Sequence, residues 1–379
     1  MTNAESTEST GSSSLPLSGV RVLDATQALS GPYGTMLLAD LGADIVKLER
    51  PGVGDDARHW GPPFVGASAT YFVSVNRNKR SVALDLRDPN GQAGFMRLLA
   101  SADVFVQNWR PGVAEALEAD YESLSKKFRD LIYCAISGFG ADGPRLSGYD
   151  HVIQGFAGLM TLNGEPDAVP TKLGVPLGDL AAGMFAAQAI MAGLIGRQSS
   201  GLGSYIDISM HDCLLSLLTY QSARYLATNV NPLRTGNMHP SIVPYGTFET
   251  ADGLVNICIG SDEQWRRLCV ALDGQDLISD PRFRTNPERC LHRVELHTWL
   301  EPRLRQCHTA GLLDQLRHAQ VPAGPIRTVE EALESAVTRE LGTTHPVHGS
   351  RRLQRRSRRR PLEDRWRAGA TPYSPASAR

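Results

Sequence analysis

The stretch GVRVLDATQALSGPYGTMLLADLGADIVKLE, residues 19–49, decides the fold of this chain. It predicts a strand at residues 19–26, a helix at residues 32–42 and a second strand at residues 43–49. The strands are apolar rather than alternating between apolar and polar residues, which is typical of a sheet covered on both faces. A strand, a helix and another strand in succession predict a β-α-β unit, and therefore a mostly parallel sheet.

The same alternation continues through the N-terminal half of the chain. Further strands are predicted at residues 81–86, 103–109 and 130–137, and helices at residues 91–102 and 112–128. The apolar stretch from Leu180 to Gly196 is slightly short for a membrane span, so it predicts a buried helix. The predicted fold class is α/β.

The pattern changes to loop between Pro232 and Pro240. Two strands follow around the turn Ala251-Asp252-Gly253, and helices are predicted at residues 263–272 and 294–306. Trp265, on the first of these helices, is predicted to lie in the core. The segment GNMHPSIVPYG, residues 236–246, is a loop that could form a lid. This part of the chain is predicted to form a smaller second domain.

Composition excludes several classes of function. The chain has 379 residues and a formal net charge of −1, so no overall field attracts nucleic acid or an anionic membrane. The six cysteines form no C-x-x-C pair and are predicted to be reduced, packed thiols. The ten histidines form no metal-binding pair, and the N-terminus lacks the features of a signal peptide. These observations predict a cytoplasmic protein without a structural metal.

The run from Ser350 to the C-terminus is rich in arginine and has almost no apolar periodicity. Charge runs are usually solvated, which favours a disordered tail over an arm that binds nucleic acid or phosphate.

Asp179 stands in the Pro/Gly-rich loop GVPLGD, residues 174–179, directly before the predicted buried helix. An aspartate there is a good N-cap, which is the favoured interpretation from spacing alone. The alternative is a nucleophile, because a helix N-terminus favours an anion and offers free N–H groups to a developing oxyanion. Tyr149 and Asp150, with His151, precede another apolar helix, and Asp150 is again a candidate N-cap.

Basic residues lie at the ends of several predicted strands: Arg50, Arg87 and Arg110 follow strands, and Arg80 directly precedes the strand at residues 81–86. Because ligands of parallel sheets bind at strand ends, these residues are together candidate phosphate contacts. For any single one of them, a solvated surface arginine is the favoured interpretation. No G-x-G-x-x-G motif follows the first strand, which argues against a dinucleotide site.

Several segments together resemble one family, the class III coenzyme A transferases, which include formyl-CoA transferase and carnitine CoA-transferase. The resemblance runs from about Leu17 to Leu333, in the order of the family, and is most similar to members that use succinyl-CoA and dicarboxylic acids such as glutarate. Its segments are LDATQALSGPYGTMLLADLGADIVKLERPGVGDD, SVNRNKRSVALDL, ADVFVQNWRPG, SGYDHVIQG, GVPLGDLAAGMFAAQAI and RTGNMHPSIVPYGTFETADG.

The resemblance implies a covalent mechanism in which Asp179 is the catalytic nucleophile. It would be acylated by an acyl-CoA and would then carry coenzyme A as an aspartyl thioester. Acyl-CoA is a substrate, and no permanently bound cofactor or metal is implied. The family's coenzyme A contacts fall on Arg50, Leu84, Arg87 and Asn108, and its substrate contacts on Gln27, Leu29, Ser30, Tyr149 and Asp150.

The resemblance also implies an interlocked homodimer. The expected organisation is a disordered tail at residues 1–15, a large Rossmann-like domain at residues 16–230 and a smaller α+β domain at residues 235–335. A C-terminal segment at residues 336–379 is expected to return to the large domain, although its Arg-rich end departs from the family pattern.

Four residues depart from members with other reactions. Leu29 replaces a glutamine of formyl-CoA transferase, and Ser147 and Ala116 replace basic residues, so formate and oxalate are disfavoured as a substrate pair. Tyr149 replaces the histidine base of the related α-methylacyl-CoA racemases. The alternatives that stay open are a racemase-type enzyme and a homologue that binds coenzyme A without turnover.

Overall fold

The computed structural model describes residues 15–342, which form two compact units. The described part of unit 1 consists of residues 15–159, 172–229 and 336–342, and unit 2 consists of residues 160–171 and 230–335. Residues 160–171, which the sequence analysis placed within the large domain, therefore cluster with unit 2. The Ser/Thr-rich start of the chain and the Arg-rich run from Ser350 lie outside the described residues.

Unit 1 is built on a six-stranded sheet in which every pair of neighbouring strands is parallel. In chain order its strands have the spatial arrangement 3-2-1-4-5-6, the order of doubly wound Rossmann sheets. The predicted α/β fold with a mostly parallel sheet is confirmed. From one edge to the other the strands are β5 (Lys79–Ala83), β2 (Asp44–Glu49), β1 (Arg21–Ala25), β6 (Val104–Gln107), β7 (Ile132–Ser137) and β8 (Ser204–Ser209).

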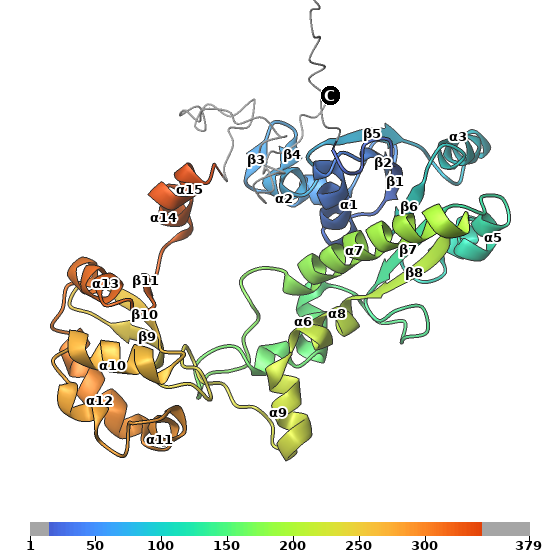
Figure 1. Ribbon diagram of the computed structural model, residues 1–379. Helices are drawn as coiled ribbons and strands as arrows, with labels where there is room; N and C mark the ends of the chain where they lie inside the picture. The colour runs from blue at the N-terminus through green and yellow to red at the C-terminus, as the bar shows by residue number, and fades with distance from the viewer. Residues whose placement is uncertain (1–14, 343–379) are drawn as a thin grey trace, which may run out of the picture. The chain divides into compact units, whose positions relative to one another are not determined.

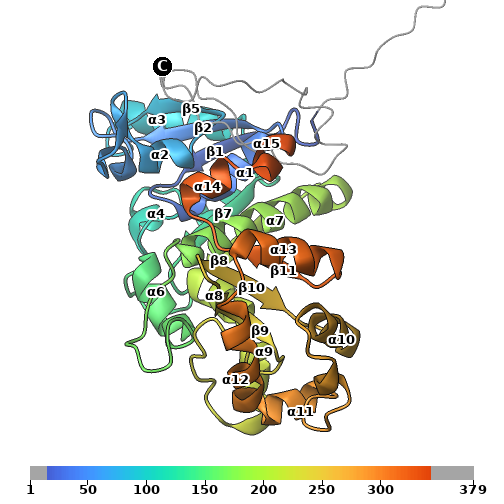
Figure 2. The same ribbon diagram turned by 90° about the vertical axis from the view of Figure 1, so that its left-hand side faces the viewer.

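The central strands of this sheet are buried on both faces, as apolar strands require. Alternate residues of one strand enter different cores: Ile132 and Cys134 face one core, and Tyr133 between them faces the other. α1 (Ser30–Asp40) and α7 (Leu177–Ser200) pack on the first face, and α3 (Pro89–Leu99) and α5 (Tyr121–Ser125) on the second (Figures 1 and 2).

The remaining elements of unit 1 connect or flank these layers. A hairpin and a short helix follow β2, and smaller helices follow β6, β7 and β8. They are η1 (Asp56–His59), β3 (Phe64–Val65), β4 (Ser68–Ala69), α2 (Thr70–Ser74), α4 (Val113–Ala116), α6 (Asp150–Phe156), α8 (Met210–Leu217), α9 (Tyr220–Thr228) and α15 (Ala336–Glu340).

The single helix predicted at residues 112–128 is wrong. It is divided into α4 and α5, because Glu118 has a φ of 50° and Asp120 starts a new helix by accepting a hydrogen bond from the Ser123 N–H at 2.9 Å. The apolar pattern spans the break, since Leu117 at the end of α4 and Leu124 of α5 pack in the same core.

α1 and α7 approach each other closely at two glycines. A Cβ atom on Gly183 would lie 2.6 Å from the Ser30 carbonyl oxygen, and one on Gly34 would lie 2.7 Å from the Gly183 carbonyl oxygen. Gly183 stands one turn after Asp179, so this contact brings the first turn of α7 against the first turn of α1.

Only one face of α7 is buried, and the other is exposed. Ala182, Ala186 and Ile190 pack in the core, whereas Met184 and Ile195 are 45% and 68% exposed. Among the described residues α7 alone has the length and hydropathy that could cross a membrane, and 44% of its most apolar window is buried in unit 1. The predicted buried helix is therefore confirmed for one face only.

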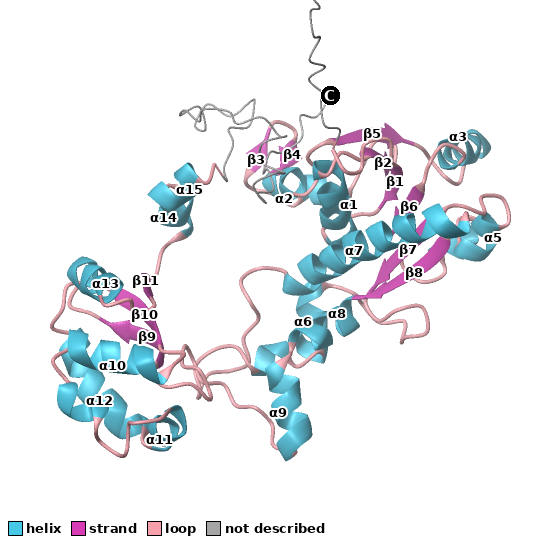
Figure 3. Cartoon of the chain, in the orientation of Figure 1, coloured by secondary structure: helices cyan, strands magenta, loops and turns pink. Residues whose placement is uncertain are grey.

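Unit 2 contains a three-stranded antiparallel sheet covered by helices (Figure 3). The predicted hairpin around Asp252 joins β9 and β10, and Trp265 is 1% exposed in the core, as predicted. The elements are η2 (Leu159–Thr161, at the boundary), β9 (Tyr245–Glu249), β10 (Leu254–Cys258), α10 (Asp262–Ala271), η3 (Gln275–Ile278), α11 (Asn286–Leu291), α12 (Arg293–Leu304), α13 (Thr309–His318), β11 (Ala323–Pro325) and α14 (Val329–Leu333).

The loop that the sequence analysis considered as a lid is tied to α11 and α12. Asn286 donates to the Ser241 carbonyl at 2.9 Å, and the fully buried Arg289 donates to the Val243 carbonyl at 2.7 Å. Arg293 donates to two further carbonyls of the loop, at 2.9 and 3.0 Å. These bonds favour a held loop over a freely moving lid. All six cysteines are free, as predicted.

Candidate active site

The candidate residues of unit 1 gather beyond the carboxyl ends of adjacent parallel strands. Gln27, Leu29 and Ser30 follow β1, and Asn108 follows β6. The crevice between strands 1 and 4 of such a sheet is the switch point at which ligands bind. α7 leads back into the parallel strand β8, so it begins at this same edge and brings Asp179 with it.

Asp179 occupies the third position of α7, not its N-cap. Pro176 is the N-cap residue, and the helix begins at Leu177. The interpretation of Asp179 as a simple cap is therefore wrong. Its carboxylate lies within the first helical turn, where the helix dipole favours a negative charge.

Asp150 caps α7 from another helix. Its own helix, α6, has Tyr149 as N-cap residue, so the interpretation of Asp150 as N-cap of that helix is also wrong. Instead, Asp150 Oδ1 accepts a hydrogen bond from the Gly178 N–H at 2.7 Å, and Oδ2 accepts one from Gln154 Nε2 at 2.7 Å. The Asp150 carboxylate is thereby held at the backbone of Gly178, the residue directly before Asp179.

Burial raises the pKa of Asp179 to about 7, and the negative charge of Asp150 adds to the rise. Hydrogen bonds from the Ser30 hydroxyl and backbone N–H oppose it by stabilising the ionised form. Ser30 is 4% exposed and starts α1, so the carboxylate of Asp179 is held between the first turns of two helices. A strongly shifted carboxylate in such a place is typical of a functional group.

The loop after β1 is fixed by Asn108. The Asn108 Oδ1 accepts from the Gln27 N–H at 2.8 Å, and its Nδ2 donates to the Gln27 carbonyl at 2.8 Å. The same Nδ2 lies 3.5 Å from Ser30 Oγ. Leu29 is 6% exposed and packs in a small apolar cluster with Met36, Val75, Tyr33, Tyr71 and Leu180. The charge of Asp179 acts on the Tyr71 hydroxyl, so this apolar cluster lies close to the carboxylate.

Comparison with known proteins identifies the family. The sequence model of CoA-transferase family III matches residues 17–366. The chain belongs to CoA-transferase family III.

Curated and solved members of family III agree with this assignment. The chain is 42% identical over 340 residues to a succinyl-CoA:glutarate CoA-transferase from Mus musculus, covering 88% of this chain and 78% of the relative. It is 40% identical over 320 residues to an acetyl-CoA:oxalate CoA-transferase from Acetobacter aceti, covering 84% and 82%. A crystal structure of a CaiB/BaiF family protein from Brucella suis matches with a TM-score of 0.80 and 38% identity, over 94% of this chain and 99% of that one.

The residues onto which the resemblance placed the coenzyme A contacts all follow strand ends in unit 1. Arg50 follows β2 and is exposed, paired with Asp56. Leu84 and Arg87 follow β5, Leu84 half-buried against α3 and Arg87 exposed. Together with Asn108 they follow β5, β2 and β6, on the same edge of the sheet as Ser30, which follows the central strand β1.

Sequence reasoning missed Tyr71 of α2. Burial, together with the charges of Asp179, Asp150 and Asp55, raises the pKa of the Tyr71 hydroxyl to about 12. The hydroxyl therefore stays protonated near the candidate nucleophile and can donate a hydrogen bond. No periodicity or motif marks Tyr71 in the run SATYF. Within residues 15–342 no cluster of histidine, cysteine or acidic side chains is placed to hold a metal ion.

Replacing Asp179 by asparagine is expected to stabilise the protein at pH 8 but not at pH 4. The folded-state pKa of Asp179, about 7, lies above the ordinary aspartate value of about 3.9 of the unfolded chain. Raising the pH from about 4 to 7 therefore removes stability from the wild type, because only the unfolded state releases the proton freely. Asparagine does not ionise, so its stability lacks this pH dependence. Melting temperatures of the wild type and the variant, compared at pH 4 and at pH 8, measure the effect.

Proposed function

We propose that the chain transfers coenzyme A from succinyl-CoA to a second dicarboxylic acid through covalent intermediates on Asp179. The observation that carries the proposal is the half-buried Asp179 carboxylate between the first turns of α1 and α7, hydrogen-bonded by Ser30. A carboxylate with little water around it is more nucleophilic than one in bulk solvent, and the hydrogen bonds from Ser30 stabilise its ionised form.

The reaction begins when the Asp179 carboxylate attacks the thioester carbonyl of the donor. The C–S bond breaks, which leaves an aspartyl–acyl anhydride and coenzyme A thiolate. The thiolate then attacks the aspartyl carbonyl, forms an aspartyl-CoA thioester and releases the donor acid as its carboxylate. No oxidant or net proton is required.

The acceptor reverses these two steps. Its carboxylate attacks the aspartyl thioester, which forms a second anhydride and releases the thiolate. Attack of the thiolate on the acceptor carbonyl yields the new acyl-CoA and regenerates Asp179. Oxygen atoms that gain negative charge in each step lie near helix N-termini, whose positive dipole ends stabilise them.

Exclusion of water is needed to preserve the thioester. Leu29, Tyr71 and Leu180 form an apolar wall beside Asp179, which supports transfer to a bound acid over hydrolysis. The buried Leu29 also favours an acceptor with methylene groups, such as glutarate, over oxalate, which has none. The relatives that act on glutarate and on oxalate are almost equally similar, so the acceptor is decided by experiment.

The test is an exchange screen with succinyl-CoA as donor and glutarate, itaconate, malate, oxalate and carnitine as acceptors, with new acyl-CoA esters separated by chromatography. Exchange with at least one dicarboxylate is expected. Absence of exchange combined with deuterium uptake from D₂O at the α-carbon of an acyl-CoA would establish a racemase instead. Binding of coenzyme A without either reaction would establish a homologue without turnover.

We also propose a homodimer. None of the residues of α9 is buried, and its Leu226 is 81% exposed. Ile195 on α7 is 68% exposed. Large exposed apolar side chains on helices are typical of an interface, and the interlocked dimer implied by the resemblance would cover them. Light scattering is expected to give twice the mass of one chain; the mass of a single chain at micromolar concentration would contradict the proposal.

A further inference from the structure

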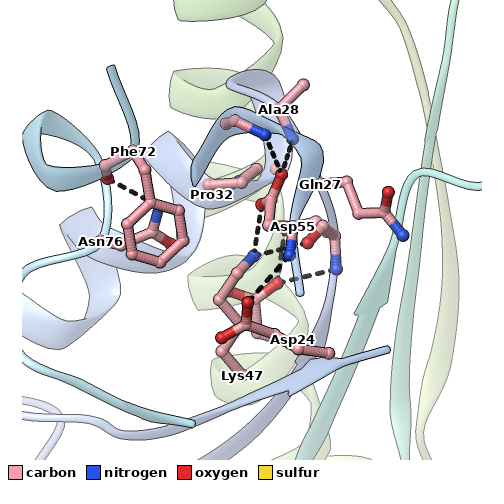
Figure 4. A network of polar contacts seen from close by, with 12 residues as sticks. Asp24, Gln27, Ala28, Pro32, Lys47, Asp55, Phe72 and Asn76 are labelled. Carbon is pink, nitrogen blue, oxygen red and sulfur yellow. Dashed lines mark hydrogen bonds and ion pairs between the residues drawn. The ribbon is translucent and has the colours of Figure 1, made fainter. Parts of the chain in front are cut away.

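The buried carboxylate of Asp55 connects Lys47, on β2, with the loop that follows β1. Its side chain is fully buried, and its Oδ2 lies 2.9 Å from Lys47 Nζ. Its Oδ1 accepts hydrogen bonds from the Ala28 N–H at 3.1 Å and the Ala57 N–H at 3.0 Å. Figure 4 shows the Asp55 carboxylate between the Lys47 ammonium group and the backbone of Ala28.

The loop held in this way has a strained backbone. Ala28 has a φ of 64°, in the left-handed region, which costs a residue with a Cβ atom about 1–2 kcal/mol. Lys47 also holds the start of this loop, because its Nζ donates to the carbonyl of Thr26, two residues before Ala28, at 2.6 Å. The loop then enters α1 at Ser30, the residue that hydrogen-bonds Asp179. The strained residue therefore lies two positions before the contact on which the candidate nucleophile depends.

We propose that Asp55, paired with Lys47, is a positioning residue that holds Ala28 in its left-handed conformation and thereby keeps Ser30 against Asp179. The inference rests on the proposed function, because it gives Asp55 a role only through Asp179. Asp55 does not touch the reacting atoms; it acts through two backbone contacts and the start of α1. Neither acid–base chemistry nor a direct substrate contact is assigned to it.

Asparagine at position 55 tests the role without a large change of volume. An amide has one acceptor oxygen, whereas Asp55 uses both of its oxygens. If the amide oxygen faces Lys47, the amide NH₂ group faces the N–H groups of Ala28 and Ala57, and two donors meet. If the amide oxygen faces these N–H groups, the NH₂ group faces the Lys47 ammonium group, and again two donors meet. In either orientation the loop or the lysine loses its partner.

The chain offers a matched control in Asp40. Asp40 forms an ion pair with Arg77 in which both side chains are 2% exposed, and its Oδ1 also accepts from Arg77 Nε and Asn78 Nδ2, both at 2.9 Å. Asp40→Asn therefore breaks a comparable buried pair, but at the opposite end of α1 from Ser30. Both variants are expected to unfold at lower denaturant concentration than the wild type.

The kinetic readout separates the two variants. Asp55→Asn is expected to lower the rate of succinyl-CoA exchange about 10- to 100-fold, since small misplacements of reacting groups have effects of this size. Asp40→Asn is expected to stay within about twofold of the wild type. Equal rates for Asp55→Asn and Asp40→Asn would overturn the proposal.

The pH profile gives a readout that a purely structural role would not move. The described groups that act on the charge of Asp179 are Asp150 from α6 and Ser30 from α1. Tyr71 from α2 also lies near this charge, which helps to raise the pKa of the Tyr71 hydroxyl. Weakening the Ser30 hydrogen bonds removes the interactions that lower the pKa of Asp179, so the acidic limb of the rate profile should move to higher pH in Asp55→Asn. It should not move in Asp40→Asn.

A second substitution tests the route through Ala28. Glycine adopts a positive φ without strain, so Ala28→Gly added to Asp55→Asn should recover a large part of the lost rate without restoring stability. If the double variant does not recover rate, and the acidic limb of the rate profile of Asp55→Asn stays at the wild-type pH, Asp55 has only a structural role and the inference is overturned. If wild-type protein shows no exchange with any acid, the proposed function fails instead, and the two failures are thereby distinguished.

Discussion

Replacing Asp179 by asparagine is expected to lower coenzyme A transfer by at least about a thousandfold. Asparagine keeps the size and most of the hydrogen-bonding shape of the side chain, so Ser30 and the start of α7 retain their places. It cannot form an anhydride or carry coenzyme A as a thioester. The loss should appear in kcat, measured as the steady-state rate of exchange between succinyl-CoA and the best acceptor.

Asp212 provides the matched control for this variant. It occupies the third position of α8, as Asp179 does in α7, but its side chain is 75% exposed. Asp212→Asn is expected to leave the exchange rate within about twofold of the wild type. Calorimetry should show that the Asp179 variant still binds coenzyme A. Retention of a tenth of the wild-type rate would contradict the role of Asp179 as nucleophile.

Asp24→Asn is expected to destabilise unit 1 by about 3–5 kcal/mol, the largest effect on stability that we predict. Asp24 is fully buried, and its Oδ2 accepts from Lys79 Nζ at 3.0 Å and from Thr35 Oγ1 at 2.7 Å. Removing its charge leaves the buried Lys79 without its ion-pair partner, whereas Lys47 keeps its pair with Asp55. Chemical denaturation at pH 7 measures the effect.

The pH dependence of this effect has a defined sign. Although burial alone would raise it, the pKa of Asp24 lies below its usual range because of Lys79 and Lys47 and of hydrogen bonds from Thr26 and Thr35. A carboxylate with a lowered folded-state pKa stabilises the fold above the ordinary aspartate pKa of about 3.9, and this stabilisation is lost as the pH falls below it. The difference in free energy of unfolding between the wild type and Asp24→Asn should therefore become smaller at acidic pH.

A surface pair serves as the control for Asp24. Asp44 pairs with Arg80, and the two side chains are 46% and 69% exposed. Asp44→Asn is expected to cost no more than about 1 kcal/mol, because exposed ion pairs contribute little. Equal costs for the Asp24 and Asp44 variants would contradict the importance of the buried network.

The order of elements in unit 1 was predictable because period and composition report burial directly. The apolar strands of residues 19–49 predicted a parallel sheet with two covered faces, and β1 and β2 have this arrangement. The helix expected at residues 112–128 was wrong because the apolar pattern is continuous while Asp120 begins a new helix. The excursion of residues 160–171 into unit 2 has no local signature, since it depends on contacts with distant residues such as Arg234.

The candidate site was predictable in part. The loop before α7 and the family resemblance both pointed to Asp179, but spacing alone favoured a cap. The structure places the cap on Pro176 and assigns the capping hydrogen bond to Asp150, which comes from a different helix. A distant partner of this kind leaves no trace in local spacing.

The buried charges did leave a signal that went unused. Asp24 and Lys47 stand inside the two apolar strands of residues 19–49. A charged side chain in a strand buried on both faces must find an opposite charge, so each predicts an ion pair. The identity of the partners, Lys79 and Asp55, depends on tertiary structure and could not be predicted from the strands alone.

The most direct test of the account is mass spectrometry of the protein after incubation with succinyl-CoA. Proteolysis at low pH should yield a peptide containing Asp179 that carries coenzyme A as a thioester, and hydroxylamine should remove the adduct. The adduct should be absent from Asp179→Asn and present in Asp212→Asn. Rapid exchange by the wild type with no adduct on Asp179, or with an adduct on another residue, would contradict the account.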